Sequence, residues 1–290
     1  CMFCGLCASS CPSGAIEVAY YELDELCDYV KKAVDAGKRV LAITCRGSTP
    51  PEEELKRMLE AHSINADEAA VVTVPCAGRV RMEFLLKSYT LGVEKAILIP
   101  CEADYCRFKR GSTASVKRVA LLRSLLATLG IGEDWLVLAQ SARRAEVDAY
   151  RCQGCGRCAL TCPYEAITIN PPGIAEVDAS KCMGCGLCLA VCPAFAISIK
   201  GFEYDEISQR IRSEASKYVG AKTREKPAIL LLCCQWSEYT ALDEVREGKA
   251  LDNVCVVELP CASRVDSLHI IEALSLGFDG VLVVACRKDE

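Results

Sequence analysis

Histidine is almost absent from this sequence, and so are several patterns by which enzymes are usually recognised. The 290 residues include two histidines, His62 and His269. Both lie in segments with helical periodicity, and we interpret both as structural. No G-x-G-x-x-G loop follows a predicted strand, so no dinucleotide site is predicted. No side chain is placed as a general acid, base or nucleophile, and the sequence therefore predicts no self-contained substrate site.

Long apolar runs and an excess of positive charge are missing too. The longest apolar runs are AILLLCC and GVLVVAC, far shorter than the roughly 20 residues that a membrane-spanning helix needs. The formal net charge of -5 argues against a dedicated nucleic-acid-binding protein. We therefore predict no membrane span and no nucleic-acid partner.

Cysteine is the residue present in excess, with 22 copies. A secreted disulfide scaffold is one explanation, but such scaffolds are short, whereas this chain is long enough for two or more domains with their own cores. Most of the cysteines fall into tight spacings typical of metal ligands. The composition therefore predicts metal sites in a reducing compartment, the cytoplasm.

Three segments share the pattern C-x2-C-x2-C-x3-C-P. Three thiolates at this spacing can hold one face of a [4Fe-4S] cluster, while the fourth cysteine points to a partner cluster. Zinc is the alternative, because C-x2-C pairs also suit tetrahedral zinc, but zinc sites combine two pairs and lack the x3-C-P ending. The predicted ligands are Cys1, Cys4, Cys7 and Cys11; Cys152, Cys155, Cys158 and Cys162; and Cys182, Cys185, Cys188 and Cys192.

The second and third of these runs repeat at a step of 30 residues, as VDAYRCQGCGRC and VDASKCMGCGLC. A short strand-like piece follows each run. The segment of about residues 146–200 resembles the bacterial two-cluster ferredoxin. The resemblance implies crossed ligation, in which each cluster takes three cysteines from one run and the last cysteine from the other: Cys152, Cys155, Cys158 and Cys192 for one cluster, and Cys182, Cys185, Cys188 and Cys162 for the other.

A longer repeat covers most of the chain. Residues 1–26 align without gaps on residues 182–207, a step of 181, and VPCAGRV (74–80) matches LPCASRV at a step of 185. The first cysteine run is only half of a ferredoxin unit and is not preceded by a methionine, and the position equivalent to Cys106 falls one residue past the end. We therefore expect a further cysteine run upstream and a continuation downstream.

The repeat predicts ferredoxin segments that alternate with α/β domains. In the first α/β domain, strands are expected at 39–45, 69–76, 95–101 and 134–140. Helices are expected between them, the first capped by Thr49 with Glu52 in a capping box, the second with Met82, Leu85, Leu86 and Tyr89 along one side, and the third ending at Gly130. The alternation predicts a flavodoxin-like or Rossmann-like parallel sheet. The expected domains are 1–29, 30–145, 146–200, a helical linker at 201–227, and 228–290.

Cysteines also follow three successive strands of the first α/β domain. Cys45, Cys76 and Cys101 stand at strand ends, and Cys106 lies in the loop beyond. Open parallel sheets bind their ligands at this edge, so the four thiols are predicted to converge on one metal site. The alternative is that they are buried core cysteines, which is how we interpret Cys27, inside a helix, and Cys255, inside a strand.

The segments PCAGRV, CEADYC and SVKRVALLRSLLATLGI, with LLCCQWSEYTALD, PCASRV and GFDGVLVVAC in the second copy, resemble the delta subunit of methyl-viologen-reducing hydrogenase. The resemblance covers about residues 38–145 and 228–290. It implies an electron-transfer domain with a [2Fe-2S] cluster that joins hydrogenase or formate dehydrogenase to heterodisulfide reductase. A ferredoxin followed by FEYDEISQRI and this domain resembles the A subunit of heterodisulfide reductase fused to a delta subunit.

The matching positions imply which residues hold the cluster of each α/β domain. The ligands would be Cys45, Cys76, Cys101 and Cys106 in the first copy, and Cys234, Cys261 and Cys286 in the second. Either Cys233 or Cys234 could fill the first of these second-copy positions. The family's C-N-W-C motif usually ends in cysteine or selenocysteine, where CCQWS has Ser237, and TCRGST in the first copy lacks the tryptophan. Arg79 and Arg264 adjoin these cysteines and are predicted to bind the cofactor by balancing its charge.

We therefore predict an electron-transfer subunit that relays electrons between [4Fe-4S] and [2Fe-2S] clusters. Two [4Fe-4S] sites would be complete, a third partial, and Cys11 would serve a further cluster. The partners would be other subunits of a heterodisulfide reductase, hydrogenase or formate dehydrogenase complex, with electron bifurcation as one role of that complex. Two alternatives remain: a thiol–disulfide redox enzyme that uses Cys101 and Cys106, and a structural subunit braced by metal.

Overall fold

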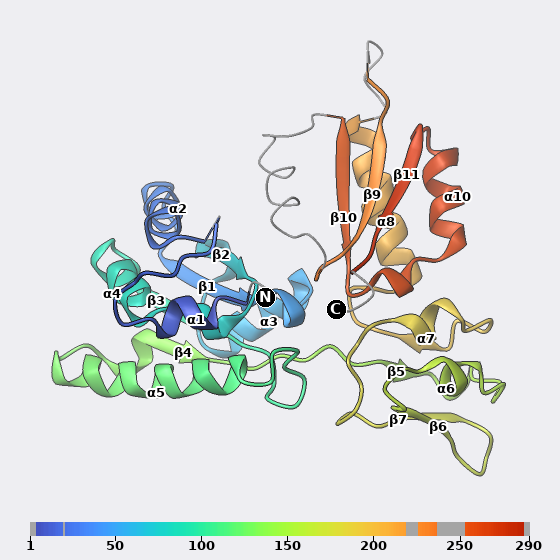
Figure 1. Ribbon diagram of the computed structural model, residues 1–290, viewed down its shortest axis with the longest axis horizontal. Helices are drawn as coiled ribbons and strands as arrows, with labels where there is room; N and C mark the ends of the chain where they lie inside the picture. Colours follow the sequence, from blue (N-terminus) through green and yellow to red (C-terminus); the bar gives the residue numbers. More distant parts are fainter. Residues whose placement is uncertain (1–3, 20, 219–225, 237–252, 287–290) are drawn as a thin grey trace. The chain divides into compact units, whose positions relative to one another are not determined.

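The computed structural model describes residues 4–19, 21–218, 226–236 and 253–286 (Figure 1). The chain forms two compact units, Cys1–Ala142 and Arg143–Glu290. Each unit combines a cysteine-rich segment with the α/β segment that follows it in the chain. No helix in the described ranges is both long and apolar enough to cross a lipid bilayer.

The first unit is built on a four-stranded parallel sheet with the strand order β2-β1-β3-β4. Every residue of the central strand β1 is buried, as the continuous apolar run predicted for a strand covered on both faces. The predicted parallel α/β architecture is confirmed. The strands are β1 (Val40–Cys45), β2 (Ala69–Val74), β3 (Lys95–Ile99) and β4 (Leu136–Leu138).

Helices cover both faces of this sheet. On one face, Leu55 and Leu59 of α3 pack against Ala42 of β1. On the other face, three helices bury side chains such as Phe84 and Leu122 against the sheet. The helices are α2 (Leu23–Asp35), α3 (Glu52–Ala61), α4 (Met82–Thr90) and α5 (Gly111–Thr128), with the short α1 (Leu6–Ser10) and the 3-10 turns η1 (Arg46–Ser48), η2 (Ala66–Glu68), η3 (Ala77–Arg79) and η4 (Glu133–Trp135).

One local prediction for this unit was wrong. Helix α3 has Pro51 as its N-cap and Glu52 as its first residue, and the Thr49 hydroxyl instead donates to the carbonyl of Cys45 at 3.0 Å. In α4, Leu85 is buried and Met82 and Leu86 pack against the same core, which also buries Phe84.

The second unit opens with a small ferredoxin fold. Strand β5 (Glu146–Val147) pairs with β8 (Ile197–Ser198), and β6 (Ile167–Ile169) pairs with β7 (Ala175–Val177), both antiparallel. Two short helices, α6 (Arg157–Thr161) and α7 (Leu187–Ala190), follow glycines in the left-handed conformation. That conformation strongly favours glycine, and it turns each cysteine loop into its helix.

The rest of the second unit repeats the first. Its parallel sheet has the order β10-β9-β11, which corresponds to β2-β1-β3. Helix α8 packs on α10 as α2 packs on α4. The elements are α8 (Tyr204–Tyr218), β9 (Ile229–Cys234), β10 (Val254–Leu259), η5 (Ala262–Arg264), α10 (Ser267–Ser275) and β11 (Gly280–Val284).

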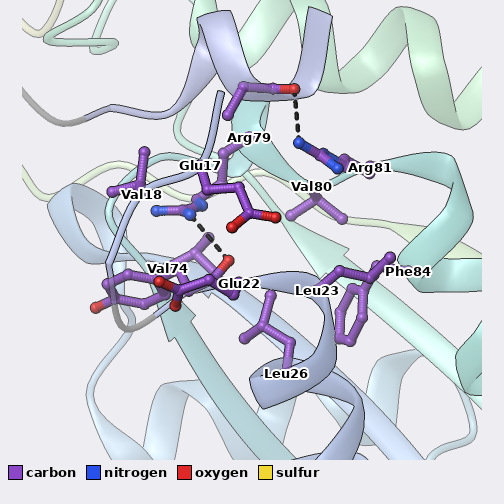
Figure 2. A pocket seen from close by; sticks show the side chains of 12 residues that line it. Glu17, Val18, Glu22, Leu23, Leu26, Val74, Arg79, Val80, Arg81 and Phe84 are labelled. Atoms are coloured by element: carbon purple, nitrogen blue, oxygen red, sulfur yellow. Dashed lines mark hydrogen bonds between the residues drawn. The ribbon is translucent and has the colours of Figure 1, made fainter. Parts of the chain in front are cut away.

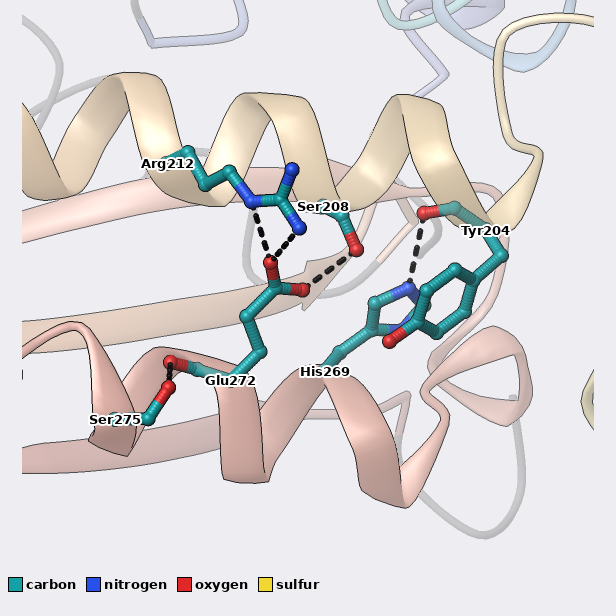
Figure 3. Close-up of polar contacts among 6 residues, drawn as sticks. All are labelled: Tyr204, Ser208, Arg212, His269, Glu272 and Ser275. Carbon is teal, nitrogen blue, oxygen red and sulfur yellow. Dashed lines mark hydrogen bonds and ion pairs between the residues drawn. The ribbon is translucent and has the colours of Figure 1, made fainter.

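Polar side chains join α8 to α10 (Figure 3). Glu272 accepts hydrogen bonds from the Ser208 hydroxyl at 2.6 Å and from Arg212 at 2.7 Å. His269 is fully buried and stacks on the Tyr204 ring, with ring centroids 4.6 Å apart. Burial lowers the pKa of His269 below its usual value of 6.5.

This buried histidine predicts acid sensitivity of the α8–α10 pair. Because the pKa of His269 is lower in the folded state, the unfolded state takes up the proton first. The stabilisation is fully present above pH 6.5 and is lost as the pH falls from 6.5 through the folded-state pKa. Hydrogen exchange of α8 and α10 peptides, corrected for intrinsic rates, should show this loss of protection. The His269→Gln variant should lack the pH dependence, and His62→Gln should retain it; retention in both variants would contradict the assignment.

Candidate metal centres

Two cavities of similar size lie in the ferredoxin segment. One, of about 350 Å³ with its open mouth included, is lined by four cysteines: Cys152, Cys155, Cys158 and Cys192. The other, of about 330 Å³, is lined by Cys182, Cys185, Cys188 and Cys162. Each cavity thus collects three cysteines of one run and the last cysteine of the other, the arrangement that crossed ligation requires.

Four backbone N–H groups donate to sulfur atoms of these cavities, in two pairs that are equivalent in the two halves of the ferredoxin segment. All four N···S distances are 3.4 Å, and the donors and acceptors correspond at the 30-residue step: Ala175 to Cys152, Ala145 to Cys182, Ala196 to Cys192, and Ala166 to Cys162. Donors of this kind stabilise the negative charge of a thiolate and tune the potential of a bound cluster.

The electrostatics of these cavities favour a cationic occupant. Burial raises the pKa of Cys188 to about 12, and burial also raises the pKa values of Cys158 and Cys185. Metal ligands, however, must be thiolates. A metal ion supplies the positive charge that deprotonates such a thiol, so iron in the cavity would reverse the effect of burial.

The first α/β sheet gathers four further cysteines at one edge. Cys45 ends β1, Cys76 follows β2, and Cys101 follows β3 and forms an isolated bridge with Ser141. Cys106 lies in the next loop, and all four side chains are at most 5% exposed. Cys101 and Cys76 both hydrogen bond to Cys45, and Cys101 also does so to Cys106. The structure therefore brings together the four thiols that the sequence predicted to converge.

Hydrogen bonds divide these four thiols into two kinds. The Cys101 thiol lowers the pKa of Cys106 to about 6, helped by the N–H groups of Ser112, Phe108 and Gly111. The pKa of Cys45 is also lowered, mainly by Cys101 and Cys76. The two donors have raised pKa values, because the thiolates that they face hold their protons.

The start of α5 closes tightly over these sulfurs. The Ser112 N–H donates to Cys106 Sγ at 3.4 Å, and the Ser112 hydroxyl donates to the carbonyl of Cys101. A Cβ atom at Gly111 would lie 2.2 Å from Cys76 Sγ and 3.5 Å from Cys106 Sγ. Only glycine fits at this position while the sulfurs stay in place.

In the described ranges, no three cysteine, histidine, aspartate or glutamate side chains have the arrangement that a single metal ion needs.

Three cysteines gather at the same edge of the second α/β sheet. Cys234 Sγ lies 3.5 Å from Cys286 Sγ, and Cys261 hydrogen bonds to Cys234. Cys234 corresponds to Cys45 at the end of the central strand, and strand alternation places Cys233 on the opposite face. The structure thus brings Cys234 to this site. Ser237 lies outside the described residues.

Other described cysteines lie elsewhere in the chain. Cys27 lies in α2, and Cys255 lies in β10, where burial raises its pKa to about 12. Of the first run, Cys4, Cys7 and Cys11 lie around α1, and the Cys11 sulfur contacts the Ser13 hydroxyl at 3.3 Å. Cys1 is outside the described residues.

Arg264 joins the two parts of the second unit. It is 2% exposed, and a Cβ atom at Gly186, next to Cys185, would lie 2.8 Å from its Cδ. Its Nε donates to the carbonyl of Phe202 at 2.9 Å. Arg264 follows Cys261 by three residues, so one side chain spans the ferredoxin cysteine loop and the α/β cysteine turn.

Arg79 makes the same junction in the first unit. A Cβ atom at Gly5, next to Cys4, would lie 2.9 Å from Arg79 Cβ. The guanidinium donates to the carbonyl of Tyr21 at 3.1 Å and lies 4.4 Å from the centre of its ring. Sequence reasoning missed these contacts, although Gly5 and Tyr21 correspond to Gly186 and Phe202 at the 181-residue step.

A cavity of about 500 Å³, with its open mouth included, lies beside Arg79 (Figure 2). Its lining is mainly apolar, with Glu17, Glu22 and Arg81 among the polar residues. Arg81 donates to the carbonyl of Ala8 in α1 at 3.0 Å and so ties α1 to the α/β domain. No cysteine lines this cavity, and we assign no cluster to it.

Three protein-family matches cover the chain. Residues 40–150 and 229–290, together more than half of the chain, match the family described as methyl-viologen-reducing hydrogenase, delta subunit. Residues 145–199 match the 4Fe-4S dicluster domain, and residues 1–17 match the 4Fe-4S binding domain.

Curated relatives with similar sequences are components of redox complexes. The A subunit of the ferredoxin:CoB-CoM heterodisulfide reductase of Methanosarcina mazei is 36% identical over 59% of this chain and 21% of that protein. The A subunit of the ferredoxin/F(420)H(2)-dependent CoB-CoM heterodisulfide reductase of Methanosarcina acetivorans is 40% identical over the same shares. The iron-sulfur D subunit of the F420-non-reducing hydrogenase of Archaeoglobus profundus is 35% identical over 27% of this chain and 60% of that protein. The chain thus spans about a fifth of the two reductase proteins.

The tight contact at Gly111 yields a test of the α/β site. Gly111→Ala should displace Cys76 Sγ, because the new Cβ would lie 2.2 Å from it. We expect a lower thermal midpoint for the first unit and less iron bound per chain, measured by differential scanning calorimetry and by iron analysis. Gly280→Ala is the control, since its nearest atom is the end of Ile229 at 3.2 Å. Equal iron contents in both variants would show that the four thiols hold no iron.

Proposed function

This chain belongs to the family of the methyl-viologen-reducing hydrogenase delta subunit, with 4Fe-4S binding domains in the same chain, and from that premise we propose that it relays single electrons between iron–sulfur clusters. The observation that carries the proposal is the junction in the second unit. There the cavity lined by Cys185 adjoins the site of Cys261, and the two sulfurs are close enough to affect each other's charge. Two redox groups held side by side can exchange an electron without movement of the chain.

The proposal assigns cluster ligands cysteine by cysteine. The two ferredoxin cavities would each hold a [4Fe-4S] cluster with crossed ligation, and Cys1, Cys4, Cys7 and Cys11 would serve further [4Fe-4S] clusters. The α/β sites would hold [2Fe-2S] clusters, and the bound clusters supply one-electron redox capacity. Their ligands would be Cys45, Cys76, Cys101 and Cys106 in the first unit, and Cys234, Cys261 and Cys286 in the second.

The chain's own residues would set the environment of these clusters. Backbone N–H groups at the sulfurs stabilise thiolate charge, and the buried side chains around them exclude water. The buried guanidinium groups of Arg79 and Arg264 would offset the negative charge of neighbouring clusters. These contributions would determine how readily each site accepts an electron.

We also propose a fold type, domain bounds and a cellular context for the chain. The order β2-β1-β3-β4 is that of the first four strands of a flavodoxin-like sheet. The domains would be 1–29, 30–145, 146–200, 201–227 and 228–290. The chain would act in the cytoplasm within a heterodisulfide reductase- or hydrogenase-like complex of the electron-bifurcating kind, with formate dehydrogenase subunits among its partners. The names of the relatives support the reductase and hydrogenase contexts.

A thiol–disulfide enzyme is the second candidate, and one observation favours it. Cys101 hydrogen bonds to Cys106 and lowers its pKa to about 6, a value typical of a reactive thiolate. The third thiol neighbour, Cys45, counts against this candidate, because a dithiol enzyme needs one exchanging pair whereas a cluster uses all four cysteines.

The two candidates differ in iron content. We expect Cys101→Ser and Cys106→Ser, each in the full chain prepared anaerobically, to lose about two irons per chain and a [2Fe-2S] EPR signal. Cys27→Ser is the matched control, because Cys27 lies in α2 outside both sites. Unchanged iron together with a reversible Cys101–Cys106 disulfide, detected by thiol titration and mass spectrometry, would favour the thiol enzyme instead.

The junction arginine predicts a shift in reduction potential. Arg264 is buried, and its positive charge interacts electrostatically with Cys188. Arg264→Met removes this cation, so the potential of the cluster held by Cys182, Cys185 and Cys188 should become more negative in an EPR-monitored titration. Arg264→Lys should shift it less. Arg212→Met, which changes a half-exposed ion pair with Glu272, is the control, and an equal shift in that variant would remove the assigned role.

A further inference from the structure

Three glycines of the chain occupy equivalent positions but have different surroundings. Gly5, Gly156 and Gly186 each follow the second cysteine of a run, with φ angles of 76°, 73° and 84°. At Gly5 and Gly186, an added Cβ atom would meet Arg79 or Arg264 at 2.9 or 2.8 Å. At Gly156 it would meet no atom of the described residues within 4 Å. The loop over the first ferredoxin cavity is therefore open where the other two are covered.

The neighbouring positions in α6 are equivalent to residues that make the junction in the first unit. At the repeat steps, Arg157 corresponds to Leu6 and Leu160 corresponds to Ser9. A Cβ atom at Gly78 of η3 would lie 2.6 Å from Leu6 Cδ2, and the Ser9 hydroxyl donates to the carbonyl of Gly78 at 2.9 Å. Arg157 and Leu160 thus occupy the positions that contact η3 in the first unit. Among the described residues, no equivalent turn packs against Arg157 and Leu160.

These residues form a continuous surface over the first cavity, which we call the α6 face: Cys155, Gly156, Arg157 and Leu160. Cys155 is exposed, and Leu160 is 88% exposed. An open groove runs from Leu160 past Cys192 and Pro193 to Phe195, which is 52% exposed. A single exposed leucine is ordinary, but an apolar groove beside two cysteines that line a cluster cavity marks an interaction site.

We propose that the α6 face is the docking surface for an acidic electron-carrier protein that exchanges single electrons with the cluster held by Cys152, Cys155, Cys158 and Cys192. This inference rests on the proposed function, since it takes that cluster as given. Both arginine turns in the described ranges are already engaged, η3 by α1 and η5 by α7, and the occupant that we propose is therefore a partner protein. A second copy of the chain would have the same turns engaged.

The charge of the α6 face argues for an acidic partner. Arg157 stands where the two covered loops have leucine, Leu6 and Leu187. It is exposed and forms no ion pair with any described residue, and Asp266 across the groove caps α10 through the Leu268 N–H. A carboxylate of the partner would pair with Arg157 while an apolar side chain covers Leu160. Opposite charges would also raise the rate of encounter at low salt.

The redox step on this surface is a one-electron exchange. The reduced carrier loses one electron, and the cluster of the first cavity gains it. No bond forms or breaks, and no proton is required. Cys155 is the exposed ligand on the α6 face and provides the shortest path through the protein, whereas Cys158 is buried.

The test uses the full chain, loaded with clusters under anaerobic conditions, and a reduced acidic two-cluster bacterial ferredoxin as the probe. Stopped-flow absorbance would follow reduction of the chain. Leu160→Glu should slow this reduction at least about tenfold, because it places negative charge and a polar group against the carrier. The Arg157→Ala variant should be slower at low salt and less sensitive to added salt.

Three controls separate docking from cluster loss. Leu121→Glu alters a leucine on α5 that is 59% exposed, and it should react like the parent chain. Reduced methyl viologen, which needs no docking surface, should reduce all variants equally. Iron content and EPR spectra of Leu160→Glu should match those of the parent, since Leu160 lines neither ferredoxin cavity.

Each result bears on one of the two proposals. Ferredoxin that reduces Leu160→Glu as fast as the parent overturns the docking inference and leaves the cluster assignment standing. A parent chain that methyl viologen reduces but the ferredoxin does not also overturns it. A parent chain without [4Fe-4S] clusters overturns the proposed function, and the inference with it.

Discussion

The fold depends on one electrostatic constraint: a thiolate removed from water needs a positive charge beside it. Burial is the largest cause of the raised pKa values of cysteines such as Cys188 and Cys255. In the core, Cys255 satisfies the constraint by remaining a thiol. The cluster cavities satisfy it with N–H donors at the sulfurs and space for a cationic occupant. The carboxyl edge of the parallel sheet and the cysteine-containing turns occur in both units. Each of these features places several sulfur atoms close together.

Both units also share a packing contact between an arginine side chain and a glycine. Arg79 and Arg264 each follow an α/β cysteine and cross the glycine of a ferredoxin loop. Any Cβ atom on that glycine would push the arginine away, and with it the cysteine turn. The guanidinium also hydrogen bonds to a backbone carbonyl. This bond fixes the position of the arginine side chain over the glycine. This arrangement links a ferredoxin half to the α/β domain that follows it in each unit.

Much of this architecture was predictable, and the failure at the start of α3 has a physical cause. Buried strands such as β1 were found because both faces are apolar, and the four-thiol site was found because parallel strands end at one edge. The cap of α3 was not predicted correctly, since the Thr49 hydroxyl bonds to the carbonyl of Cys45. Local pattern specifies an element, but its neighbours decide its orientation.

By itself, the sequence determined the cysteine spacings, the alternation of strands and helices, and the repeat at 181 and 185 residues. The cysteine spacings follow from the small size of a cluster, whose ligands must lie close together. The alternation of strands and helices follows from the periodicity of apolar residues. Only the tertiary structure decided that Cys234 rather than Cys233 meets Cys286, that Arg264 lies on Gly186, and that Gly156 is left open. Such contacts join residues far apart in the chain, so packing rather than local order sets them.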